Sequence, residues 1–142
     1  MNPEGLLLDT HVLIWFVEGK LSSSAVATIV DSGLKRPCHY SPVSAWEAGL
    51  LARPDRHGVP RYRFDPDPLC WYGDLAKVPY FEETALTAEI LIASSNLPGD
   101  FHADPADCML VATARSLRCP LMTRDRKILD YAQHGHVMAI AC

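Results

Sequence analysis

Two aspartates stand three residues apart in the segment HADPADCMLVATA, residues 102–114, just before an apolar run. Asp104 precedes Pro105, and this pair is typical of a helix start with Asp104 as the N-cap. Asp107 is then the third residue of the helix, in the first turn, where the helix dipole favours negative charge. Capping accounts for Asp104. Asp107 also stands at the mouth of a helix that its apolar residues predict to be buried.

Two further aspartates stand where parallel strands are expected to end. Asp9 ends the apolar segment 5–9, which predicts a short buried strand, and Asp125 follows the expected strand 119–123. In open parallel sheets, sites form beyond the carboxyl ends of the strands. The two aspartates are therefore expected at one edge of a sheet, although each is also a suitable cap for the helix that follows it.

Glu47 lies inside the segment SPVSAWEAGLLA, residues 41–52, whose Ser-Pro start predicts a helix. At helical spacing it shares a face with Val43, Leu50 and Leu51, which is expected to point inward. A buried carboxylate is costly without a partner. Two interpretations remain open, an ion pair with an arginine and a place in a site.

Four converging carboxylates would repel one another and raise their own pKa values. A divalent cation relieves that repulsion, and a donor set made only of oxygens suits Mg²⁺ or Mn²⁺ better than Zn²⁺. Such ions activate a water molecule and bind phosphate oxygens during in-line attack on a phosphodiester. If the acids converge, they predict metal-dependent phosphodiester chemistry.

The elements that must position these acids alternate along the chain. We expect short strands at residues 5–9, 38–40, 78–80, 119–123 and 136–141. We expect helices at 10–19, 24–33, 41–52, 69–76, 84–95, 105–117 and 124–132. Short apolar strands that alternate with helices predict an α/β domain with a parallel sheet covered on both faces.

Length and composition set the broader class. A chain of 142 residues predicts a single domain, residues 1–142, and 49% hydrophobic with 21% charged residues is typical of globular proteins. We find no apolar run of the roughly 18 residues that a membrane span needs and no signal peptide, so we expect a cytoplasmic protein. The net charge of −4 argues against a constitutively basic nucleic-acid binder.

The five cysteines are odd in number and have no close pairs, which argues against a disulfide framework and a zinc ribbon. We expect buried free thiols instead. The aromatic residues Trp15, Phe16 and Trp46 are expected in the core, because aromatic side chains bury large areas.

Two groups of arginines are candidates for RNA contacts. Segment 53–68 is rich in proline and arginine and predicts a loop, in which Tyr62 and Phe64 stand among the basic residues. Basic and aromatic residues together favour single-stranded RNA, although a solvated loop explains the same pattern. The candidates are Arg53, Arg56, Arg61 and Arg63 in the loop, and Arg124 and Arg126 beside Asp125.

Four segments in order resemble the PIN-domain ribonucleases, most closely the VapC-type toxins of bacterial toxin–antitoxin pairs. They are LLLDTHVLIWF (6–16), SPVSAWEAG (41–49), HADPADCMLVATA (102–114) and LMTRD (121–125). Each motif alone is weak, but together they cover nearly the whole chain in the family's order. The resemblance implies a three-layer α/β/α sandwich with a central parallel sheet and an acidic Mg²⁺ or Mn²⁺ site.

By this resemblance, Asp9, Glu47, Asp107 and Asp125 are the catalytic and metal-binding residues. Asp9 and Asp107 are expected to be the strongest ligands, while Glu47 and Asp125 complete the ligand set or orient the attacking water. Thr123 is expected to hydrogen-bond a ligand from behind, and Asp104 to have a secondary role that capping fits.

The chain departs from one branch of the family at two places. It has Ala106 where that branch usually carries Phe, and Cys108 where it usually carries Arg. The acids remain, so the departure bears on RNA preference rather than on catalysis. The resemblance also implies a homodimer and a cognate antitoxin that covers the acidic groove.

The leading hypothesis is a metal-dependent endoribonuclease toxin that cleaves single-stranded or looped RNA. One alternative is a non-catalytic binding module on the same fold. The other is a phosphohydrolase with an aspartyl nucleophile, which expects Asp-x-Asp after the first strand. The chain reads Asp9-Thr10-His11 there, which argues against that class.

Overall fold

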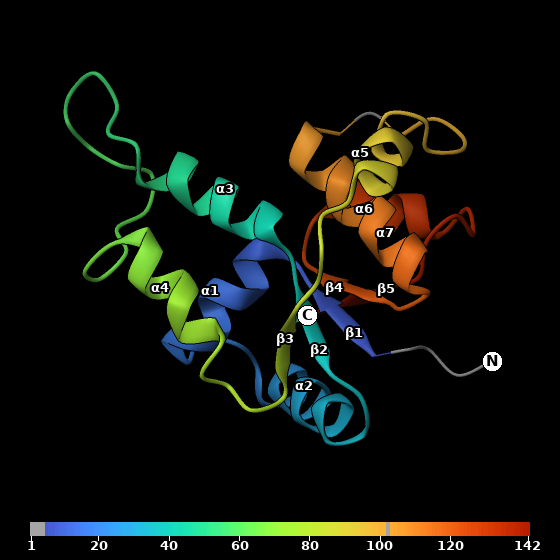
Figure 1. The fold of residues 1–142 in the computed structure, drawn as a ribbon, viewed down its shortest axis with the longest axis horizontal. Coiled ribbons are helices and arrows are strands. Elements are labelled where there is room, and N and C mark those ends of the chain that lie inside the picture. The colour runs from blue at the N-terminus through green and yellow to red at the C-terminus, as the bar shows by residue number, and fades with distance from the viewer. Residues whose placement is uncertain (1–4, 102) are drawn as a thin grey trace.

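The computed structural model describes residues 5–101 and 103–142, and its centre is one parallel sheet (Figure 1). Five strands of the described residues form it in the order β3-β2-β1-β4-β5, and each neighbouring pair is parallel. The strands are β1 (Leu6–Leu8), β2 (Cys38–Tyr40), β3 (Phe81–Glu83), β4 (Leu121–Thr123) and β5 (Ala139–Ala141). The predicted α/β class is confirmed, with β1 in the middle.

Seven helices of the described residues connect the strands. They are α1 (Thr10–Glu18), α2 (Ser23–Lys35), α3 (Pro42–Ala52), α4 (Pro68–Leu75), α5 (Ala88–Ser94), α6 (Pro105–Leu117) and α7 (Arg126–Ala132). Short polar side chains begin them, as the sequence indicates: Ser41 and Asp104 each precede a proline and accept a hydrogen bond from a main-chain N–H in the first turn.

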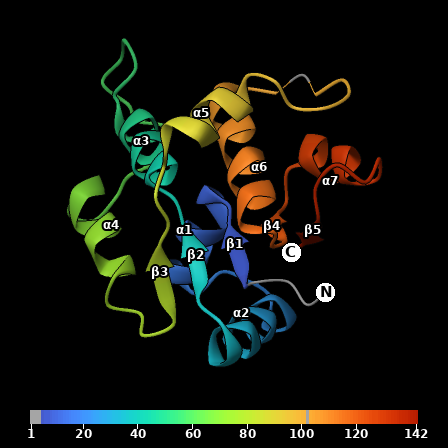
Figure 2. The same ribbon diagram turned by 45° about the vertical axis from the view of Figure 1, so that its right-hand side comes forward.

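The helices form a layer on each face of the sheet. Helices α1, α2 and α4 share one apolar cluster with Leu6 and Leu8 of β1, whereas α6 and α7 share a second cluster with Leu7. Figure 2 shows α4 on one side of the sheet and α6 and α7 on the other. Because β1 is buried on both faces, its position is fixed, and so is that of Asp9, which follows it.

Several element boundaries differ from the expected ones. Helix α2 continues past Gly33, the residue expected to end it, as far as Lys35. Gly33 instead leaves room for a neighbouring element, since a Cβ there would lie 2.7 Å from the Tyr80 side chain. The strand expected at 78–80 is instead β3, which pairs with β2. Helices α5 and α7 and strands β4 and β5 begin two to four residues later than expected.

Two expectations about burial are also corrected. Trp46 is 47% exposed, so the prediction that it belongs to the core is wrong, whereas Trp15 and Phe16 pack against the core while partly buried. All five cysteines are free, as expected, but only some are buried. Cys38 and Cys119 are buried, Cys70 is exposed, and Cys108 and Cys142 are intermediate.

Among the described residues, no single helix is long and apolar enough to cross a membrane, and only the pair α1 and α2, bent by 104°, meets the length and composition criteria together.

Helix α6 carries Asp107, and its packing offers a test of the fold. Leu110 is fully buried in the cluster between α6 and β1. We predict that Leu110→Ala lowers the free energy of unfolding by about 2–5 kcal/mol, because it leaves a cavity. Urea denaturation measures this. Leu69→Ala is the control, since Leu69 is 82% exposed, and an equal loss in both variants would contradict the packing described.

Candidate active site

Five acidic residues line one hollow of about 320 Å³ beyond the carboxyl ends of β1 and β4. They come from four places in the chain: the end of β1, helix α3, the start of α6 and the end of β4. The residues that line it are Asp9, His11, Trp15, Glu47, Asp104, Asp107, Arg124 and Asp125. The four acids named from the sequence are therefore brought together around one space, with Asp104 beside them.

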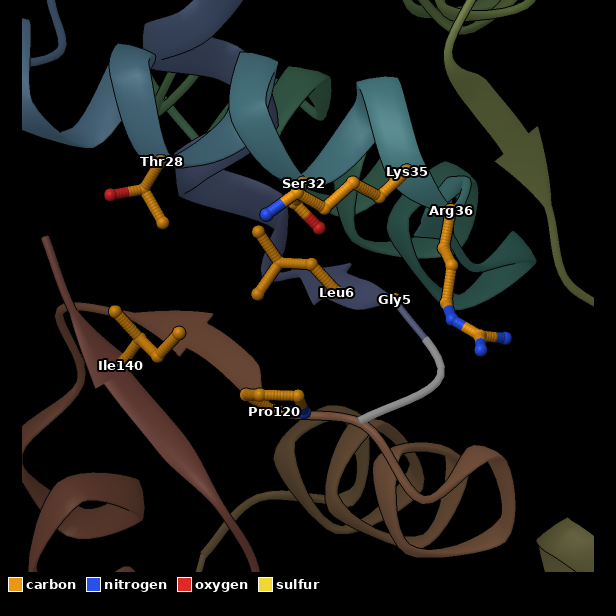
Figure 3. Close-up of a pocket in the computed structure, with 8 residues that line it drawn as sticks. All are labelled: Gly5, Leu6, Thr28, Ser32, Lys35, Arg36, Pro120 and Ile140. Atoms are coloured by element: carbon orange, nitrogen blue, oxygen red, sulfur yellow. The ribbon is translucent and has the colours of Figure 1, made fainter. Parts of the chain in front are cut away.

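A larger hollow of about 400 Å³ lies at the opposite edge of the sheet, where Gly5 and Pro120 precede β1 and β4 (Figure 3). Helix α2 contributes Thr28, Ser32 and Lys35 to its wall. None of the described acids lines it, so the chemistry predicted from the sequence belongs to the other edge.

Asp9 is the most enclosed of the acids, with 8% of its surface exposed. Its Oδ1 accepts a hydrogen bond from the Thr10 N–H at 2.7 Å, and its Oδ2 accepts one from the Thr123 hydroxyl at 2.6 Å. Its main-chain N–H donates to the Met122 carbonyl at 3.1 Å, which joins it to β4. Burial raises the pKa of Asp9, although both hydrogen bonds oppose that shift.

Thr123 connects Asp9 with Asp125. Its Oγ1 donates to Asp9 and also accepts a hydrogen bond from the Asp125 N–H at 3.0 Å. Asp125 then begins α7, because its Oδ1 accepts from the N–H groups of Lys127 and Ile128. The contact expected for Thr123 behind an acidic residue is thus present, and Asp125 caps a helix while it lines the hollow.

Glu47 finds a hydroxyl partner rather than the arginine that sequence reasoning offered. The Thr10 hydroxyl donates to its Oε1 at 2.5 Å, and Ser44, one turn earlier on α3, lies 2.9 Å from the same hydroxyl. Burial, followed by the charge of Asp9, raises the pKa of Glu47 to about 7, although the Thr10 hydrogen bond lowers it. The arginine alternative is therefore wrong.

Asp104 and Asp107 divide the roles expected of them at the start of α6. Asp104 is exposed, and its Oδ1 accepts from the Asp107 N–H at 2.9 Å, so the predicted N-cap is confirmed. The described residues offer the half-buried Asp107 carboxylate no hydrogen-bond donor. Burial, reinforced by the nearby charges of Asp104 and Asp125, raises its pKa to about 8.

The donor chemistry of this hollow fits a hard divalent cation, since the acids supply only oxygen ligands and raise one another's pKa values. Within residues 5–101 and 103–142, however, no three His, Cys, Asp or Glu side chains lie close enough together to hold one ion as they stand. The acids therefore surround one space without forming a closed ligand set.

The predicted RNA-binding arginines are divided in space. Arg124 lines the acidic hollow, whereas Arg126 is exposed on α7 outside it. Arg53, Arg56, Arg61 and Arg63 are exposed in the segment after α3, and none of them lines the hollow.

The aromatic residues among those arginines are not free for bases. Phe64 is buried, and Tyr62 packs edge-on against it with ring centroids 4.6 Å apart. The expectation that both side chains interleave with the arginines as RNA contacts is corrected, because they fill the space under the loop beside Trp71.

Sequence reasoning missed the hydroxyl groups that position the acids. Thr10 follows Asp9 directly, and Ser44 lies three residues before Glu47, so both stand one step or one helical turn from an acid. That spacing is a signal, but only the contact between α1 and α3 shows that the two hydroxyls meet.

Comparison with known proteins agrees with this geometry. Residues 6–133 match the family model described as PIN domain. Ribonuclease VapC22 of Mycobacterium tuberculosis (strain ATCC 25618 / H37Rv) is 26% identical over 127 residues, which cover 89% of this chain and 91% of that protein.

Two solved structures share the fold. VapBC2 from Rickettsia felis, bound to a DNA fragment from its promoter, matches with a TM-score of 0.68 at 9% identity. DNA-bound VapBC from Salmonella typhimurium matches with a TM-score of 0.64 at 13% identity. Each match covers 96% of this chain and 97% of the other. At these identities the likeness shows the fold alone. It confirms the predicted PIN-like α/β architecture.

The raised pKa values predict how stability depends on pH when EDTA removes divalent cations. In the unfolded chain, Asp107 and Glu47 lose their protons near their ordinary pKa values of 3.8 and 4.5, but in the folded chain they hold them up to about pH 8 and 7. The folded state binds more protons in between, so stability falls as pH rises from about 5 to 8. We predict a higher Tm at pH 8 and a weaker pH dependence for Asp107→Asn, measured by thermal unfolding.

Asp31→Asn is the matched control, because Asp31 is exposed on α2, away from the acidic hollow. It should keep the pH dependence of the unmodified chain. If the stability of Asp107→Asn depends on pH as strongly as that of the unmodified chain, the raised pKa of Asp107 is refuted.

A second prediction concerns Thr123, which is fully buried. Thr123→Val keeps the shape but removes the donor to Asp9 and the acceptor for the Asp125 N–H. We expect the free energy of unfolding to fall by about 1–3 kcal/mol, because buried polar groups lose their partner. Urea denaturation tests this beside Thr28→Val, whose exposed hydroxyl only bonds within its own helix. Equal effects would show that the Asp9 contact contributes nothing.

Proposed function

This chain belongs to the PIN-domain family, and from that premise we propose that it is a Mg²⁺- or Mn²⁺-dependent endoribonuclease, the toxin of a toxin–antitoxin pair. In this proposal residues 1–142 act as one domain on single-stranded or looped RNA. The observation that carries the proposal is the convergence of five carboxylates on one hollow at the strand ends. The 26% identity to a ribonuclease over 89% of the chain supports it.

The uncompensated acids favour catalysis over a purely structural role. Burial and mutual repulsion raise the pKa values of Glu47 and Asp107 well above those of ordinary carboxyls. A structural site gains nothing from such an arrangement, whereas clustered groups with shifted pKa values are typical of active sites. A divalent cation bound here would polarise the phosphodiester and lower the pKa of the attacking water.

The residues take distinct roles in this proposal. Asp9 and Asp107 would hold the ion, and Thr123 keeps the Asp9 carboxylate oriented through its hydrogen bond to Oδ2. Binding an ion would require the carboxylates to move closer together, since they do not form a closed ligand set as they stand. Asp125 completes the ligand set from the end of β4, and Asp104 keeps α6 and Asp107 in place as the N-cap.

Glu47 is suited to receive a proton from the attacking water. A general base gains from a raised pKa, and burial raises the pKa of Glu47 to about 7 in the absence of a cation. Its Oε1 is engaged by the Thr10 hydroxyl, so the other oxygen takes the proton. The hydrogen bond from Thr10 also fixes the direction in which that oxygen points.

The proposed partners are RNA, a cognate antitoxin and a second copy of the chain. The two structural neighbours are VapBC proteins, and that likeness supports an antitoxin partner. Exposed apolar side chains on α3 and α5, among them Trp46 and Ile92, offer surface for such contacts. Action on cellular RNA places this activity in the cytoplasm.

The two alternatives have less support. A non-catalytic module on the same fold leaves the elevated pKa values of Glu47 and Asp107 without a use. An aspartyl phosphohydrolase expects a second aspartate two residues after the nucleophile, and the chain has His11 at that position after Asp9.

The proposal predicts metal-dependent RNA cleavage by the purified chain. Mixed tRNA and ribosomal RNA, incubated with Mg²⁺ or Mn²⁺, should give discrete fragments that EDTA abolishes. Asp9→Asn and Asp107→Asn should lower the cleavage rate about 100-fold or more, because each removes a charged oxygen ligand. Gel analysis of end-labelled RNA gives the rates.

Asp130→Asn serves as the control, since Asp130 is exposed on α7 and lines no part of the acidic hollow. It should cleave like the unmodified chain. A folded protein that binds Mn²⁺ but cleaves no RNA would reject the RNA substrate, and one that neither binds Mn²⁺ nor cleaves would favour the binding module.

A further inference from the structure

Arg124 is the one arginine or lysine of the described residues that lines the acidic hollow. It stands between Thr123 and Asp125, directly after β4. A phosphodiester that enters a hollow walled by five carboxylates meets strong repulsion, so a cation at its rim is where the first attraction arises. The contacts that the Arg124 guanidinium makes within the protein therefore decide whether it is available to bind a substrate.

Two contacts hold the Arg124 side chain in one place. Its guanidinium carbon lies 4.1 Å from the centroid of the Trp15 ring, which is a cation–π contact. Its Nε–H donates to the main-chain oxygen of Cys142 at 3.2 Å. Trp15 is itself fixed, because it packs against the core and its ring contacts that of His11, with centroids 5.6 Å apart.

These contacts keep Arg124 away from the acids that surround it. Within the described part of the chain, no aspartate or glutamate side chain forms an ion pair with its guanidinium, although five acids line the same hollow. The contact to the Cys142 oxygen uses Nε, and the Cys142 thiol also interacts with the guanidinium. Arg124 is nevertheless exposed, so the outer part of its guanidinium is accessible for a bidentate contact with a ligand.

We propose that Arg124 binds a phosphate group of the RNA backbone at the rim of the acidic hollow, and that Trp15 is the positioning residue that holds it there. This inference rests on the proposed ribonuclease function and adds a substrate contact to it. A guanidinium matches two phosphate oxygens in a planar, bidentate geometry. In this arrangement a cation held by the acids would contact one phosphate, and Arg124 would contact the RNA backbone at the rim of the same hollow.

The test measures RNA binding without cleavage. In the Asp107→Asn background with Mg²⁺, fluorescence anisotropy gives the Kd of a short labelled single-stranded RNA at several salt concentrations. Arg124→Gln should weaken binding about tenfold and lower the slope of log Kd against log salt by about 0.7–1, the value of one lost phosphate contact. Arg124→Lys should keep the slope but recover only part of the affinity, because it restores the charge and not the bidentate geometry.

Trp15 is tested through its coupling to Arg124. Trp15→Leu should weaken RNA binding when Arg124 is present but have no further effect in the Arg124→Gln chain, because its role is to hold that arginine. Trp15→Phe keeps an aromatic ring under the guanidinium and should retain most of the affinity. Independent, additive losses from the two substitutions would overturn the positioning role.

Arg36→Gln is the matched control, because it removes the same charge at the opposite edge of the sheet (Figure 3). Equal losses of affinity and slope in Arg36→Gln and Arg124→Gln would overturn the proposal, as would unchanged binding in a folded Arg124→Gln. If the unmodified chain neither binds nor cleaves RNA, the ribonuclease function itself fails. If it cleaves and Arg124→Gln cleaves and binds equally well, only this inference fails.

Discussion

The hydrogen bond from Thr123 to Asp9 is the contact on which the site depends. It joins residues 114 positions apart in sequence and connects the ends of β1 and β4, which are neighbours in the sheet. The Thr123 hydroxyl also accepts from the Asp125 N–H, so one side chain sets the places of two acids. Because β1 is buried on both faces, this end of the sheet cannot shift without disturbing both apolar clusters.

Capping a helix and lining the acidic hollow are not alternatives for these acids. Asp104 and Asp125 each use Oδ1 to cap a helix, and their caps fix where α6 and α7 begin. Asp107 does no capping with its side chain, and burial together with its acidic neighbours raises its pKa to about 8. One acid, Asp104, thus positions another whose pKa is strongly raised, and the pattern DPAD alone shows this relation only in part.

The sequence predicts the elements best where local signals agree with packing. Ser-Pro and Asp-Pro pairs locate α3 and α6, and apolar runs locate β1 and β4. The prediction fails where tertiary contacts overrule local signals. Gly33 lies inside α2, where the lack of a side chain leaves space for the Tyr80 ring rather than ending the helix. Two of the three residues of strand β3 are exposed glutamates, which an edge strand tolerates. The composition of this segment alone therefore argues against a strand at this place.

The site residues follow the same division. Asp9, Asp107 and Asp125 are predictable because strand ends and a helix start fix their backbone positions. Glu47 is predictable because it lies on the expected inward face of its helix. The partners of Glu47 and Arg124 are not predictable, because hydroxyl and aromatic contacts depend on how α1 lies against α3 and β4. Those contacts decide the electrostatics: Thr10 binds Glu47 as a neutral donor, and Trp15 holds the nearest arginine without an ion pair. The acids therefore repel one another, and the packing of the surrounding core must offset the free-energy cost of that repulsion. Binding of a cation is favoured because it relieves the repulsion.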